Sequence, residues 1–454
     1  MLGRSFASDL NLYLVPVTHQ YFGGTWHADI LALHRTYGSV VRIAPNEVSV
    51  VHPDLARTVY SYQHGTRKFF NATDPNEHAF LRRRVSAVYS MSYILSQDDK
   101  IQSVLDAALA RFEHIVDTDG GLVSLSDWAS FFAYDVVGKL CVDEPMGFIK
   151  EGKDADNFIQ AIHDAFYWTG NMGHLPGQSF LLMNPLMNWL GERLGLRDAG
   201  FTAAFVKVSV EQVVKRMRTN PAGVKHQNDM LDYFLAMKDT NGQPVGMPEV
   251  MAEVGNLLAA GADTTSVAIK AVLGYILQDR SRYRRLQSEL DEAASRNTHR
   301  SLPYSTVKDL PFLTACIKEG FPPAGGITFD GCFVPQSATI SMNPLAQNRC
   351  QRLFGSDADT WLPERWILGD GSSEEEVKAM DRNLASFGHG SRVCVGRNLA
   401  TVEVYKFVSQ LLLRFDVELV EPNRPWKISS FWVADIENLF IQLKKRDHDT
   451  AARD

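Results

Sequence analysis

The chain has 454 residues, of which 45% are hydrophobic and 22% are charged, as in a globular protein with a substantial core. Its formal net charge of -7 is spread along the chain without a dense basic block, which argues against a nucleic-acid partner. The five cysteines are irregularly spaced, which argues against a secreted disulfide scaffold and for a reducing compartment; they are Cys141, Cys316, Cys332, Cys350 and Cys394.

The N-terminal region carries neither a secretory signal pattern nor a membrane span. Its most apolar piece, residues 10–17, is much shorter than the roughly 20 apolar residues that cross a bilayer. We therefore expect a chain that is soluble or at most peripheral to a membrane.

The predicted elements begin with a β-hairpin over residues 40–51, where two β-branched runs flank a Pro-Asn turn. From about 76 to 290 the pattern is mostly helical, and residues 246–279 predict one long apolar helix through the middle of the domain. Strands are predicted late in the chain, at 338–342, 416–420 and 439–445. A helix is predicted at 396–415. The fold class is therefore mainly α with small β-sheets.

Cys394 lies among glycines, directly before the predicted helix 396–415. The positive end of that helix dipole would favour a thiolate, which is the form that binds metals or attacks electrophiles. The surrounding residues leave room for a flat ligand, offer a cation for a carboxylate and supply an apolar wall; they are Gly388, Gly390, Gly396, Arg392 and Phe387.

Other interpretations of this stretch weigh against a ligand thiolate. A lone cysteine in a glycine turn is most often only a buried free thiol, and His389 could be a ligand instead. A phosphate loop is excluded, because the glycines do not fit G-x-G-x-x-G and no strand precedes them.

The whole string F-G-x-G-x-R-x-C-x-G, from Phe387 to Gly396, resembles the haem-binding signature of the cytochrome P-450 superfamily. The resemblance implies Cys394 as the axial thiolate on the iron of haem b, and Arg392 as the partner of a haem propionate. It also implies one large domain over 1–454 with a long central helix over the haem. Its β-rich part is expected at roughly 36–60 and 322–345. Its helical part is expected at roughly 76–320 and 396–415.

AGADTT, residues 260–265, resembles the oxygen-activation motif of the same superfamily. Gly261 suggests close approach of a group to the helix backbone, since glycine costs about 1 kcal/mol relative to alanine there. Thr264 can donate a hydrogen bond to a carbonyl one turn back. The resemblance implies that Asp263 and Thr264 form the acid–alcohol pair that delivers protons to dioxygen, with Gly261 beside the haem.

Two more segments resemble the family. His78 and Arg82 lie four apart on one helix face, as in its propionate-binding helix, although a solvated basic helix gives the same pattern. WLPERW resembles its Pro-Glu-Arg segment, so Arg365 is expected in a buried ion-pair network with Glu319.

The family pattern E-x-x-R is broken, because Pro322 stands where the arginine is expected. The stretches 319–326 and 61–78 both look short of the family, which suggests either mis-joined coding sequence or a divergent protein. An unbalanced Glu319 would weaken the fold, since breaking a buried ion pair typically costs about 3–5 kcal/mol. We therefore expect weak haem retention.

The main hypothesis is a monooxygenase that inserts one atom of O2 into an apolar small molecule, with electrons from NADPH through a separate reductase. YGSVVRIAPNEVSV and VYSMS most resemble filamentous-fungal enzymes of the pisatin demethylase type, which act on secondary metabolites and xenobiotics. Substrate would contact the central helix at Leu257, Ala260 and Gly261.

Two alternatives remain open: a haem binder or paralogue with impaired catalysis, and a haem-thiolate isomerase or dehydratase. The acid–alcohol pair argues against the second alternative. The expected location is the cytoplasmic side, either soluble or peripheral to the endoplasmic reticulum, and whether an N-terminal anchor precedes this chain is left open.

Overall fold

The computed structural model describes residues 23–44, 47–51, 74–154, 157–172, 228–297, 301–320, 339–341, 343–431 and 433–446, with a few positions between 184 and 218. The turn at 45–46, most of 61–78, Pro322 and Cys332 lie outside the described residues. The helices are α2 (Trp26–Tyr37), α4 (Pro75–Val85), η1 (Ser86–Tyr89), α5 (Met91–Ser96), α6 (Asp98–Asp119), α7 (Leu125–Val142), α8 (Phe148–Glu151), α9 (Phe158–Met172), α13 (Met230–Leu235), α14 (Met247–Gln278), α15 (Arg280–Ser295), α16 (Tyr304–Val307), α17 (Pro311–Gly320), α18 (Pro344–Gln347), α19 (Gln351–Phe354), η3 (Pro363–Trp366), α20 (Glu374–Asn383), η4 (Gly390–Arg392) and α21 (Arg397–Arg414). The strands are β1 (Val40–Ala44), β2 (Glu47–Val50), β3 (Leu122–Ser124), β4 (Thr339–Ser341), β5 (Phe415–Leu419), β6 (Lys427–Ser430), β7 (Ala434–Glu437) and β8 (Phe440–Lys445).

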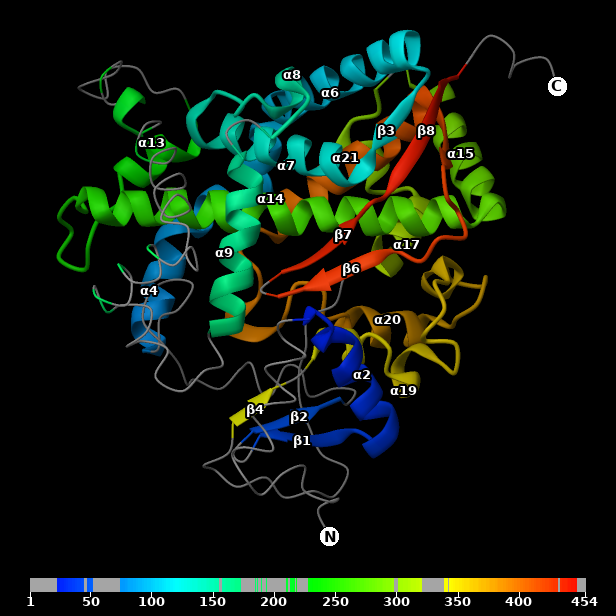
Figure 1. Ribbon diagram of the computed structural model, residues 1–454, viewed down its shortest axis with the longest axis horizontal. Helices are drawn as coiled ribbons and strands as arrows, with labels where there is room; N and C mark the ends of the chain where they lie inside the picture. The colour runs from blue at the N-terminus through cyan, green and yellow to red at the C-terminus, as the bar shows by residue number, and fades with distance from the viewer. Residues whose placement is uncertain are drawn as a thin grey trace.

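Helix α14 is the centre of the fold and crosses the molecule from side to side in Figure 1. It has 32 residues and begins with a proline in its first turn, where the missing backbone N–H costs nothing. By length and composition α14 could cross a membrane, but 78% of its apolar window is buried inside the protein. The predicted central helix is thus a core helix, and it packs most extensively against α7.

Helices α7 and α21 complete the core around α14. Both are buried along most of their length, which is why their sequences show little amphipathic alternation. Aromatic rings fill the space where α6, α7, α21 and β5 meet: Phe112 contacts Trp128, Phe407 and Phe415 edge to face, at centroid distances of 5.2, 6.5 and 6.4 Å.

Three small sheets surround the helices. Strands β1 and β2 form the predicted antiparallel hairpin, and β4 joins β2 in parallel, which makes the sheet at the bottom of Figure 1 beside α2. Strands β3, β8 and β5 form a second sheet, and β6 pairs with β7. The predicted strands 338–342, 416–420 and 439–445 correspond to β4, β5 and β8, whereas β3, β6 and β7 were not predicted.

Candidate functional site

Cys394 lies in a tight loop between η4 and α21. Its backbone N–H donates to the carbonyl of Phe387 at 2.8 Å, which closes the loop. Gly388 and Gly390 have φ of +69° and +64°, a left-handed conformation that side chains other than glycine adopt at a cost. Two of the predicted glycines are therefore required by the backbone turn that presents the cysteine.

The thiol of Cys394 is exposed, whereas Cys141, Cys316 and Cys350 are buried. Burial by the surrounding protein nonetheless raises the pKa of Cys394, and this rise is opposed by the backbone N–H groups of Gly396 and Arg397 and by the charges of Arg82 and Arg397. The thiol thus lies directly before α21, where the N–H groups at the start of the helix favour the thiolate as predicted, but burial outweighs them.

A basic cluster of His78, Arg82 and Arg392 lies beside Cys394. Burial lowers the pKa of His78, and the charges of Arg392 and Arg82 lower it further. Burial also lowers the pKa of Arg82, while the nearby Cys394 raises it. Helix α4 presents the first two side chains, and Asp74 caps it by accepting from the N–H groups of Asn76 and Glu77 at 2.8 Å.

These residues fit a haem. Two guanidinium groups and an imidazole gathered next to one thiol suit a ligand that brings carboxylates to one edge and a metal to its centre. Within the described residues no group of three His, Cys, Asp or Glu side chains could hold a metal ion without such a ring.

Thr264 lies on an exposed side of α14. Its hydroxyl donates to the carbonyl of Ala260 at 2.8 Å, one turn back, and Thr265 makes the same bond to Gly261 at 2.8 Å. Ala260 and Thr264 are both exposed, while Ala262, Asp263 and Thr265 are buried. The helix thus presents the predicted alcohol on an accessible face.

Asp263 points into the protein instead. Its Oδ1 lies 3.3 Å from Nε2 of His163 on α9, and its Oδ2 is buried without a hydrogen-bond partner among the described residues. The hydroxyl of Tyr134 on α7 is close enough that Asp263 raises its pKa, in addition to the larger effect of burial. Nothing in the sequence pattern identifies His163 or Tyr134 as partners of Asp263.

Two residues expected near a ligand have packing roles. A Cβ on Gly261 would lie 3.1 Å from Val137 Cγ2, so the close approach inferred at this glycine is that of helix α7. Leu257 is only 3% exposed and belongs to the main apolar core, so the expectation that it contacts substrate is wrong. Of the three proposed substrate contacts, Ala260 is the exposed one.

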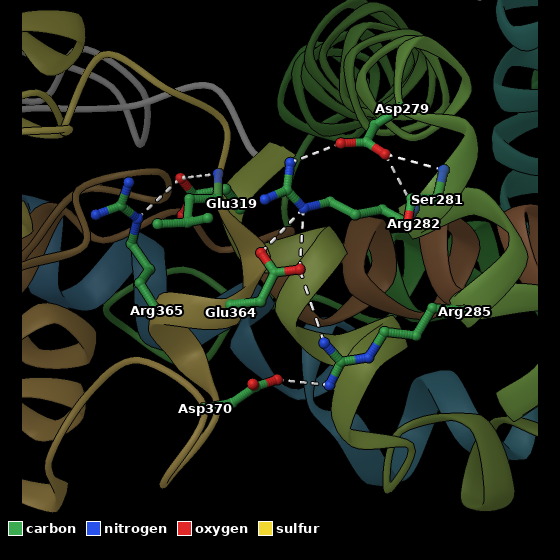
Figure 2. Close-up of polar contacts among 9 residues, drawn as sticks. Asp279, Ser281, Arg282, Arg285, Glu319, Glu364, Arg365 and Asp370 are labelled. Atoms are coloured by element: carbon green, nitrogen blue, oxygen red, sulfur yellow. Dashed lines mark hydrogen bonds and ion pairs between the residues drawn. The ribbon is translucent and has the colours of Figure 1, made fainter.

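Glu319 and Arg365, expected to form a buried ion pair, lie 3.1 Å apart from Oε1 to Nε (Figure 2). The same carboxylate accepts from the N–H of Leu362 at 3.1 Å and from the indole N–H of Trp366 at 2.6 Å. Both oxygens of Glu319 therefore have donors, although Arg365 is the one cation among these three partners, and the expected weak haem retention stays a prediction. Burial still raises the pKa of Glu319, and these donors oppose that rise only in part.

The guanidinium of Arg365 is also saturated. It donates to the carbonyls of Phe354, Asp357 and Thr360 and to the carboxylate of Asp357. A second network lies next to it in Figure 2: Arg282 holds Glu364 at 2.9 Å and Asp279 at 2.8 Å, which joins α15 to η3. This second network was not predicted.

Comparison with known proteins identifies the family of the chain. The sequence matches the family Cytochrome P450 over residues 12–443. Cytochrome P450 monooxygenase cicH of Emericella nidulans is 29% identical over 459 residues, which cover 93% of this chain and 90% of that protein. Cytochrome P450 monooxygenase gsfF of Penicillium aethiopicum is 31% identical over 436 residues, covering 88% and 84%.

The fold also has solved counterparts. The crystal structure of the cytochrome P450DA heme domain superposes with a TM-score of 0.75 at 17% identity, over 96% of this chain and 95% of that one. The predictions of the family, of a mainly helical fold with small sheets and of an oxygen-incorporating oxidoreductase are confirmed. The chain belongs to the cytochrome P450 family.

Proposed function

We propose that this cytochrome P450 holds haem b through the thiolate of Cys394 and inserts one atom of O2 into an apolar small molecule. One observation carries the proposal: the exposed cysteine lies directly before α21, with N–H groups of Gly396 and Arg397 directed at its sulfur and Arg82 beside it. Haem, when bound, supplies the dioxygen chemistry, and a thiolate ligand donates electron density that favours O–O cleavage.

The chain's own residues bind and position the reactants. His78, Arg82 and Arg392 would hold the haem carboxylates, with Phe387 as an apolar wall and Gly388 and Gly396 leaving the backbone close to the ring. Thr264, on the exposed side of α14, would hold a proton on its hydroxyl at the reacting side, and Asp263 would supply the next proton from the interior. Ala260 would contact the substrate.

The relatives reported above are fungal monooxygenases, and their names give no substrate. A role in fungal secondary metabolism or xenobiotic oxidation fits them. Electrons would come from NADPH through a separate reductase, and the place of action would be the cytoplasmic side, soluble or peripheral to the endoplasmic reticulum.

A reduced carbon monoxide difference spectrum of the purified chain tests the ligand. We expect a thiolate-type Soret band that disappears in Cys394→Ser and persists in Cys350→Ser, the control at a buried cysteine. A band that survives Cys394→Ser contradicts the proposal. Apolar compounds that shift the Soret band are then tested for NADPH-dependent product with a reductase. Haem binding without product would support the catalytically impaired paralogue. Product formed without NADPH or O2 would support the isomerase or dehydratase.

A further inference from the structure

A part-buried polar contact joins helices α9 and α14. His163 Nε2 lies 3.3 Å from Asp263 Oδ1, and the two residues are 100 positions apart in the sequence. The side chain of His163 is 34% exposed and that of Asp263 is 5% exposed. The contact therefore connects a solvent-accessible imidazole to a carboxyl group in the interior.

The second carboxyl oxygen of Asp263 faces the protein interior. Oδ2 is buried and has no hydrogen-bond partner in the described part of the chain, and neither has the neighbouring hydroxyl of Tyr134. Burial, and then Asp263, raise the pKa of Tyr134 well above its ordinary value, and this phenol has no exposed surface, so it gives Asp263 no direct contact with solvent. Among the described contacts, His163 is thus the one titratable link from Asp263 toward solvent.

The charges around His163 favour its protonated form. Burial lowers the pKa of His163, but the hydrogen bond and charge of Asp263 and the charge of Asp435 on β7 outweigh burial and raise it overall. Lys270 on α14 opposes them, although its ammonium lies 2.8 Å from Asp435 and is largely neutralised there. The described charged groups that act on the imidazole are thus Asp263 and Lys270 on α14 and Asp435 on β7.

We propose that His163 is the positioning residue of Asp263 and its proton link to solvent. The imidazolium releases its Nε2 proton to Oδ1 of the carboxylate, which leaves a neutral imidazole and a neutral carboxyl group. The imidazole takes a new proton from water on its exposed side, and the carboxyl group releases its proton toward Thr264. No oxidant or reductant is needed, and one proton moves inward in each cycle.

This inference rests on the proposed function, since it assumes that Asp263 feeds protons to the reacting side of α14. The alternative is a purely structural role, in which His163 only holds α9 against α14. His163→Gln separates the two, because glutamine keeps a hydrogen-bond donor toward Asp263 but does not titrate. His163→Phe removes both properties, and His114→Gln, at an exposed histidine on α6, is the control.

The first arm needs neither haem nor substrate. Histidine-labelled full-length protein is titrated by NMR, with the His163 signal assigned by its loss in His163→Gln. We expect Asp263→Asn to shift its midpoint down by about 1 pH unit or more, because an opposite charge at hydrogen-bond distance is removed. The His114 signal should not move. An unchanged His163 midpoint in Asp263→Asn overturns the pairing.

The second arm measures product formed per NADPH consumed, from pH 6 to 9 (roughly the range in which histidine titrates), on the compound that gives the largest Soret shift. We expect His163→Gln and His163→Phe to lower this ratio on the order of tenfold, as loss of an orienting partner does, and to flatten its fall at high pH. Wild-type coupling and pH profile in His163→Gln overturn the proton link. If wild-type protein shows no Soret band, the proposed function is refuted, and the NMR titration alone then tests the His163–Asp263 pair.

Discussion

Trp366 donates its indole N–H to Oε2 of Glu319 over 2.6 Å, while Arg365 holds the other oxygen of the same carboxylate. The side chain of Glu319 is only 11% exposed, so a donor at each oxygen matters for the stability of the fold. Helix α17 and η3 are joined through this carboxylate without an arginine three residues after Glu319. A tryptophan from the Pro-Glu-Arg-Trp segment therefore supplies a donor to the carboxylate whose family partner, an arginine at position 322, is missing.

Replacing Trp366 by phenylalanine should destabilise the protein. The ring would still fill its space against Phe354, but the buried carboxylate would lose a charge-assisted hydrogen bond, worth about 1.5–3 kcal/mol. Urea unfolding followed by circular dichroism measures the loss.

Trp361→Phe is the matched control for this change. Its indole N–H is buried without a hydrogen-bond partner among the described residues, and its ring stacks on Tyr275 at 5.9 Å. The same exchange should therefore cost much less at 361 than at 366. Equal losses at the two positions would mean that the Trp366–Glu319 contact does not stabilise the fold.

Asp135 organises the loop that follows α7. Its carboxylate accepts from the backbone N–H groups of Gly147, Phe148 and Ile149 at 2.7, 3.2 and 3.0 Å. Asp135→Ala leaves these buried donors unpaired, so we expect a loss of about 3 kcal/mol in the free energy of unfolding. Asp127→Ala, at an exposed position of α7, should stay within about 0.5 kcal/mol of wild type; similar effects of the two changes would refute this role.

Local signals explain which parts of the fold could be predicted. Helix α14, helix α21 and the β1–β2 hairpin follow from apolar runs, β-branched runs and a proline-containing turn, and all three lie where the sequence places them. Strands β6 and β7 have the sequences KISS and ADIE, which carry neither enough apolar alternation nor enough length to indicate a strand. They exist because they pair with each other and pack on the core.

The site divides in the same way. Cys394, its glycines and Arg392 lie within ten residues, so one local string predicts them. The partners that complete other groups are distant: His163 is 100 positions from Asp263, and Trp366 is 47 from Glu319. Such pairs depend on how helices pack in three dimensions, and a single sequence contains no period or motif that encodes them.

Gly261 should tolerate alanine only if helix α7 gives way. An alanine Cβ would lie 3.1 Å from Val137 Cγ2, closer than ordinary van der Waals contact, although alanine is the better helix former by about 1 kcal/mol. We expect Gly261→Ala to destabilise the wild-type protein and to be neutral or stabilising in a Val137→Ala background. Thermal unfolding of the four proteins of this double-mutant cycle gives the coupling, and additive effects would show that the contact is not the reason for glycine here.

Glu403 makes the stability of the protein depend on pH. It lies on α21 with no exposed surface, and neither carboxyl oxygen has a hydrogen-bond partner in the described residues. Burial raises the pKa of Glu403 well above its ordinary value, so the folded protein holds a proton that the unfolded chain releases above about pH 4.3. The free energy of unfolding should therefore fall as the pH rises, by up to about 1.4 kcal/mol per unit, until the folded-state pKa is reached.

Glu403→Gln removes this proton linkage while it preserves the size of the side chain. The free energy of unfolding of the variant minus that of wild type should be larger at pH 8 than at pH 5. Only the wild-type protein must keep a buried carboxyl group protonated as the pH rises. Urea unfolding at a series of pH values measures the difference, with Glu375→Gln on the exposed face of α20 as the control. The difference in free energy of unfolding between Glu403→Gln and wild type could instead be the same at every pH. That result would show that Glu403 releases its proton equally in the folded and unfolded states, and would contradict the prediction.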